Sequence, residues 1–273
     1  MNPTTASNAS GIKDIYVKHK ITKMSAPMLV AINTIRTSNA LMRAAQRLKV
    51  LKEAGSFKNF FLDLPMGREE LVNCIVRSVR DYERVLSELE ARGVVKPEEA
   101  HTYKTSKHLF EGLRGLDCEV RCYVHPRHHD FKLRLLDDIL METFRAKVRG
   151  IDVGEWRRIL ADYILLEAEF SRKEGKYIAR AAEDGDVCLN LSDDIIEHLK
   201  SEGFEVSVIS IERSRKPLDV LAARLRREIL FGERVSDDVV RRLVGEHIRF
   251  IDFVLKENGF ESAYEKWKDE VEL

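Results

Sequence analysis

The order of apolar and polar positions predicts five short strands separated by longer helical stretches. Each expected strand is a run of apolar or alternating residues bounded by turn-forming or charged residues. The five runs are Asp14–Ile21, Phe57–Leu64, Glu119–Val124, Asp186–Leu191 and Glu205–Ile211. The last run is the clearest, because β-branched residues dominate it.

Between and after these runs, apolar residues recur at helical spacing and the segments end near glycine. The expected helices are Pro27–Ala54, Arg68–Arg92, His101–Arg114, Phe131–Arg149, Glu155–Ala182, Asp193–Ser201, Pro217–Leu230, Ser236–Glu257 and Gly259–Trp267. Strands that alternate with helices indicate right-handed crossovers. We therefore expect an α/β fold: a small, mostly parallel sheet of about five strands, covered by long helices. The expected organisation is a disordered tail over 1–11, an α/β domain over 12–215 and a helical C-terminal region over 216–273.

Composition adds limits rather than a function. The chain has 273 residues, of which 44% are hydrophobic and 34% charged, and its net charge is zero. The high and balanced charge is typical of salt-bridged helical surfaces, as in many thermophile proteins. The sequence contains no run of 18 apolar residues, so we expect no transmembrane helix. The four cysteines form no CxxC pair, so a reducing, cytoplasmic setting is expected and a zinc knuckle is not.

The charge is unevenly distributed along the chain. Between Gly11 and Phe60, ten basic and two acidic residues give a local charge of +8. Such a segment either binds nucleic acid or an acidic protein partner, or folds against acidic helices of the same chain. The candidate partner-binding residues are Lys18, Lys20, Lys23, Arg36, Arg43 and Arg47.

Polar residues gather after the expected strands, where α/β proteins bind ligands. The densest group is the segment 125–130, which reads His-Pro-Arg-His-His-Asp. Imidazoles and carboxylates can hold a divalent metal, and His125, His128 and Asp130 are its candidate ligands. The candidate catalytic residues are His128, His129, Asp63 and Asp193. The candidate anion-binding residues are Arg127, Arg213, Arg215 and Lys216. A purely structural role is the alternative, since Asp130 would cap a helix beginning at Phe131.

Known catalytic and nucleotide-binding signatures are missing from the chain. It contains no GxSxG, GxxxxGK[ST], GxGxxG or HExxH motif. The cofactor is therefore unknown, with a divalent metal as one option.

The order of elements resembles that of the TraB and ChaN-like superfamily of α/β proteins. The resemblance rests on Phe60–Pro65 and on the late helix-strand-helix unit from Ser171 through His198, and spans residues 12–215. It implies a metal-dependent, hydrolase-like activity. Family members commonly carry Gly-x-x-His at the end of the first strand, whereas the first expected strand here contains no glycine. The usual glutamate of the second strand corresponds to Asp63. These departures imply a degenerate, non-catalytic copy.

Two hypotheses follow from the sequence. In the first, the chain is a degenerate metal-dependent hydrolase-like protein with a polar site at the carboxyl edge of its sheet. In the second, it is a non-catalytic factor that uses its basic N-terminal region to hold nucleic acid or an acidic protein.

Overall fold

The computed structural model describes residues 26–55, 57–77, 81–257 and 259–270. The expected strand Asp14–Ile21 and the basic residues Lys18, Lys20 and Lys23 lie outside these ranges.

Five strands form one sheet. They are β1 (Met28–Asn33), β2 (Asn59–Pro65), β3 (Glu119–Val124), β4 (Val187–Leu189) and β5 (Glu205–Ser210). All of their pairings are parallel, and the strand order is β3-β2-β4-β1-β5. The expected α/β class is therefore confirmed, and four of the five strands were predicted close to their observed bounds.

Eleven helices occur in the described part of the chain. The first six are α2 (Ser38–Ala54), α3 (Glu69–Arg77), α4 (Tyr82–Ala91), α5 (Pro97–Thr105), α6 (Lys107–Leu113) and α7 (Pro126–Arg149). The others are α8 (Val153–Ala181), α9 (Asp193–Ser201), α10 (Pro217–Phe231), α11 (Asp237–Lys256) and α12 (Phe260–Glu270).

The predicted helix Pro27–Ala54 was wrong in its first part. Residues Met28–Asn33 form β1, and the helix begins only at Ser38, after Thr37 caps it by accepting a hydrogen bond from the Ala40 amide. Every residue of β1 except Asn33 is buried. A strand covered on both faces consists of consecutive apolar residues without alternation, and such a run can equally be taken for helix.

By its contacts the chain divides into two units. The first comprises the residues up to Val124 together with Arg172–Arg213, and the second comprises His125–Ser171 and Ser214–Leu273. The helical region expected over 216–273 is thus accompanied, in the second unit, by α7 and most of α8.

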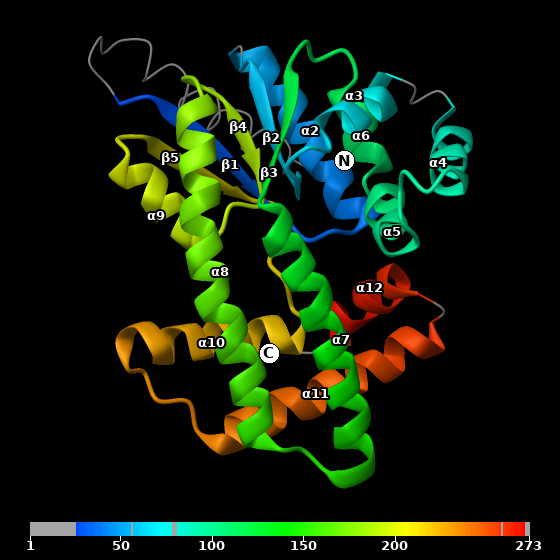
Figure 1. Ribbon diagram of the computed structural model, residues 1–273, viewed down its shortest axis with the longest axis vertical. Helices are drawn as coiled ribbons and strands as arrows, with labels where there is room; N and C mark the ends of the chain where they lie inside the picture. The colour runs from blue at the N-terminus through cyan, green and yellow to red at the C-terminus, as the bar shows by residue number, and fades with distance from the viewer. Residues whose placement is uncertain (1–25, 56, 78–80, 258, 271–273) are drawn as a thin grey trace, which may run out of the picture. The chain divides into compact units, whose positions relative to one another are not determined.

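In the first unit, helices cover both faces of the sheet (Figure 1). Met28, Val30 and Ile32 of β1 point into a core formed with α2 to α6. Leu29 and Ala31 point to the opposite face, where α9 and the end of α8 pack.

One buried carboxylate joins strands at the amino edge of the sheet. Asp186 is fully buried and accepts hydrogen bonds from the amides of Lys58, Asn59 and Glu183 and from the Asn59 side chain.

The second unit is a helical assembly with its own core, built from α8, α10 and α11. Several polar groups are buried in this unit, among them a histidine. His247 of α11 is 7% exposed, and its Nε2 lies 3.1 Å from the Thr143 hydroxyl of α7. That hydroxyl donates to the Ile139 carbonyl at 2.7 Å, so it accepts from His247, which carries its proton on Nε2. Burial lowers the pKa of His247 to about 4. The imidazole is therefore neutral in the folded unit at pH 7.

No helix within the described ranges is long and apolar enough to cross a membrane.

Candidate functional site at the carboxyl edge of the sheet

The strand order defines one place where ligands bind in related architectures. From β1 the chain leaves on the α2 face toward β2, whereas from the neighbouring β4 it leaves on the α9 face toward β5. The two connections therefore diverge between β1 and β4. Open α/β sheets bind ligands outside the carboxyl ends of the strands at such a switch point. The residues that follow these two strands are therefore the starting point of the candidate site.

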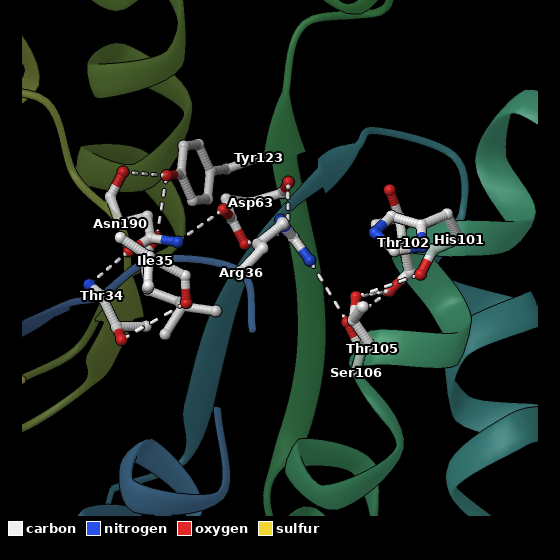
Figure 2. Close-up of polar contacts among 11 residues, drawn as sticks. Thr34, Ile35, Arg36, Asp63, His101, Thr102, Thr105, Ser106, Tyr123 and Asn190 are labelled. Carbon is white, nitrogen blue, oxygen red and sulfur yellow. Dashed lines mark hydrogen bonds and ion pairs between the residues drawn. The ribbon is translucent and has the colours of Figure 1, made fainter. Parts of the chain in front are cut away.

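Asn190, directly after β4, occupies this point. Its φ of 56° lies in the left-handed region, which asparagine tolerates better than most residues. The side chain bonds in two directions: its Oδ1 accepts from the Thr34 amide at 2.8 Å, and its Nδ2 donates to Asp63 Oδ2 at 2.8 Å. Asn190 thereby links the connection after β1 to the end of β2 (Figure 2).

Arg36, from the connection between β1 and α2, takes the other oxygen of the same carboxylate. Its Nη2 donates to Asp63 Oδ1 at 2.5 Å and to the Asp63 carbonyl at 3.0 Å. Its Nη1 donates to the Ser106 hydroxyl at 3.2 Å, and that hydroxyl donates to the Thr102 carbonyl of α5. The Arg36 and Asp63 side chains are only 25% and 15% exposed. Figure 2 shows the resulting chain of contacts from α5 across the sheet edge to Asn190.

Tyr123 of β3 supports the network from within the core. Its hydroxyl donates to the carbonyls of Leu189 and Asn190, at 2.8 and 2.9 Å. Burial, followed by the negative charges of Asp63 and Glu174, raises the pKa of Tyr123 well above its ordinary value. The hydroxyl therefore stays protonated and remains a donor, which holds Asn190 in its left-handed conformation.

Donors of the chain already bind the Asp63 carboxylate. Both carboxylate oxygens of Asp63 accept from donors of the chain, one of them a guanidinium. A divalent cation at Asp63 would compete with these donors for the carboxylate and would be repelled by the adjacent guanidinium of Arg36. The residues present therefore do not fit a metal at this point. Within the described ranges, no group of three or more His, Cys, Asp or Glu side chains is placed to hold a metal ion.

The histidine-rich segment 125–130 begins the second unit. α7 starts at Pro126, so Asp130 lies inside the helix, and its expected role as a cap is wrong. The cap is His125, whose Nδ1 accepts from the Arg127 amide at 3.2 Å. His128 is 2% exposed and stacks on Phe170, with ring centroids 5.0 Å apart.

Within the segment, Arg127 and Asp130 are exposed, and His129 is half-buried. The burial of His128 against an aromatic ring favours packing as its role. Catalysis by His128 and His129 stays a prediction.

The other candidate residues are distributed over both units. Asp193 is exposed in the first turn of α9, and Arg213 is exposed at the end of the first unit. Arg215 and Lys216 belong to the second unit, where Arg215 donates to the Lys268 carbonyl and Lys216 pairs with Asp219.

The described basic residues of the N-terminal region are partly neutralised inside the fold. Arg36 pairs with Asp63, and Arg43 pairs with Glu212. Arg47 is half-buried on α2. Partner binding by this region stays a prediction, and its described residues lend it little support.

The sequence predicts Asp63 as a catalytic residue at the carboxyl edge, and the structure places Asn190 beside it. It missed the role of Arg36, since the predicted helix from Pro27 concealed the end of β1. Tyr123 was missed because a tyrosine within a predicted strand gives no signal beyond packing.

Comparison with protein-family models, with curated proteins and with solved structures finds no match to this chain.

Proposed function

We propose that the protein is a non-catalytic, hydrolase-like α/β protein of the TraB and ChaN-like type, with a polar site at the carboxyl edge of its sheet. The observation that carries the proposal is the pairing of Asp63 with Arg36 and Asn190. A carboxylate that serves as metal ligand or base needs an oxygen open to metal or substrate. Here both oxygens already accept from donors of the chain.

The position of Arg36 is consistent with the degenerate site that the resemblance implies. The sequence places the counterpart of Gly-x-x-His in the expected strand Asp14–Ile21, which lies outside the described residues. We instead take β1, which ends at Asn33, as the counterpart of the family's first strand, and this aligns Asn33-Thr34-Ile35-Arg36 with Gly-x-x-His. The imidazole of that motif could bind a metal, whereas a guanidinium has no acceptor atom and remains positively charged. Arginine at this position, together with Asp63 in place of glutamate, supports a degenerate site that has become part of the scaffold.

Metal binding by matched variants tests the proposal. Purified protein would be analysed for bound metal and titrated with Zn²⁺ and Mn²⁺ by calorimetry, beside Arg36→His and Arg36→Gln. The native protein and Arg36→Gln are expected to bind no stoichiometric metal. Arg36→His removes the fixed charge and supplies an imidazole beside Asp63, so it is expected to gain zinc binding. Circular dichroism checks that each variant is folded.

A second set of variants shows where the proposal would fail. Stoichiometric metal in the native protein that is lost in Asp63→Asn would contradict it, as would hydrolysis of esters or phosphate esters that the same variant abolishes. Metal lost instead in the double variant His128→Ala/His129→Ala would move the site to the start of α7. Asp63→Asn keeps the size of the side chain, so these outcomes report chemistry rather than packing.

A further inference from the structure

One face of α7 is apolar and exposed within the second unit. Five large side chains lie on it: Leu136 (60% exposed), Leu140 (46%), Met141 (54%), Phe144 (53%) and Val148 (83%). Four of them follow each other at intervals of four residues, so they form one ridge along the helix. We call these five residues the α7 stripe. At 1.5 Å per residue the stripe is about 18 Å long.

The opposite face of α7 packs into its own unit. Glu142, Thr143 and Ala146 are buried, and Thr143 contacts His247 of α11. The stripe therefore belongs to a helix already anchored on its other side. Exposed apolar patches of this kind mark interaction sites in proteins.

We propose that the α7 stripe is the interface through which two copies of this chain associate, with their α7 helices antiparallel. The midpoint of the ridge from Leu136 to Val148 lies at position 142. A two-fold axis there sets Leu136 against Val148 of the second copy, and Leu140 against Phe144. The ridge is thus complementary to itself, as an isologous interface requires.

The charges beside the ridge favour the antiparallel arrangement. Asp137 lies on the amino-terminal side of the midpoint, whereas Arg145 and Lys147 lie on the other side. Antiparallel pairing sets Asp137 of each copy opposite Lys147 of the other, which gives two such pairs. Lys147 already pairs with Asp252 of its own unit, so it would lie between two carboxylates. Parallel pairing would instead set Asp137 of one copy opposite Asp137 of the other, where the like charges repel.

The exposed area suits a weak dimer. The exposed fractions of the stripe correspond to about three fully exposed apolar side chains per copy. At roughly 150 Å² for each large side chain, the lower end of the range for aromatic residues, two stripes bury at most on the order of 900 Å². Specific interfaces bury at least about 1,200 Å² in total, so the flanking charged residues must contribute the remaining buried area. We therefore expect association in the micromolar range rather than a permanent dimer.

Sedimentation equilibrium of the full chain between about 1 and 100 µM tests this inference. The native protein is expected to shift from monomer to dimer over this range. Phe144→Glu is expected to raise the dissociation constant about tenfold or more, because it sets a charge in the apolar contact. The control is Leu165→Glu, which changes a 58% exposed leucine on α8. Tyr163, two positions earlier, stacks on Phe131 of α7, so Leu165 points away from that helix.

A charge reversal distinguishes the proposed pairing from nonspecific hydrophobic association. Asp137→Lys is expected to weaken the dimer, and adding Lys147→Asp is expected to restore part of the loss. A native protein that stays monomeric at 100 µM would overturn the inference. So would a dimer that Leu165→Glu disrupts as strongly as Phe144→Glu. Near-identical circular dichroism among the variants ensures that folding does not explain a difference.

Discussion

Acidification should destabilise the helical second unit, because the buried His247 must take up a proton. The burial of its ring is what depresses the pKa from an ordinary 6.5 to about 4; the charge of Asp219 opposes this shift to a smaller extent, and that of Lys216 adds to it. The unfolded chain therefore binds the proton more tightly than the folded one. The contribution of His247 to stability is complete above pH 6.5, declines as the pH falls, and is lost below about pH 4.

The size of this effect follows from the shift. A difference of about 2.5 pH units, at about 1.4 kcal/mol per unit, amounts to about 3 kcal/mol. Domains of ordinary stability have about 5–15 kcal/mol in total. Protonation of His247 alone thus removes a substantial share of the stability of the unit.

Urea unfolding followed by tryptophan fluorescence measures this effect directly. The two tryptophans, Trp156 and Trp267, both belong to the second unit, and Trp156 meets the His247 ring edge-on at 5.8 Å. Other groups also titrate in this range, so the informative quantity is the difference between variants. His247→Gln keeps a donor for Thr143 and removes the titration. It is expected to reduce the pH dependence by about one proton between pH 6.5 and 4.

The control is His108→Gln, which changes a histidine with a 43% exposed side chain on α6. This variant should show the same pH dependence of unfolding, followed by tryptophan fluorescence, as the native protein. An equal pH dependence for the native protein and His247→Gln would refute the reasoning, as would an imidazole that titrates above pH 6 by NMR.

Three further substitutions test the packing of the first unit, each by urea unfolding followed by far-ultraviolet circular dichroism. Asn190→Ala should lower the free energy of unfolding by about 3 kcal/mol, because alanine is strained in the left-handed conformation and two hydrogen bonds are lost. Asn190→Gly should lower it by less, since glycine adopts that conformation without strain; equal losses would contradict this account. Gly112→Ala would place a Cβ 2.5 Å from that of Ala45 and should cost about 1–3 kcal/mol. Ala45→Gly should restore most of this loss, and simple additivity would argue against a steric cause. Asp186→Asn should cost about 3–5 kcal/mol, since an amide has one acceptor oxygen where four donors converge; a loss below 1 kcal/mol would be inconsistent with that geometry.

Most of the fold could be predicted from the sequence, with β1 as the instructive exception. The strands β2 to β5 are bounded by turn residues or charges, and β3 was predicted with its observed ends. Residues 28–32 are all apolar, so periodicity could not separate a buried strand from a helix. The useful signals were Pro27 before the run and Thr37 as a helix cap after it.

The candidate site was only partly predictable for the same reason. Asp63 lies near the end of β2 and Asn190 directly follows β4, and parallel strands bring such ends to one edge. Their pairing with Arg36 depended on the position of β1. The contact of Arg36 with Ser106 joins residues 70 positions apart and leaves no local pattern in the sequence.

The position of β4 has a consequence for how the chain is made. β4 separates β1 from β2, yet it begins at Val187, more than 120 residues after β2. At 5–20 residues per second, a ribosome needs on the order of 6–25 s to synthesise that interval. During this time the inner edges of β1 and β2 have no partner strand, although both strands are apolar. A growing chain must keep these edges from pairing with other polypeptides, so nascent-chain chaperones are expected to matter more for its yield than for that of a sheet assembled in sequence order.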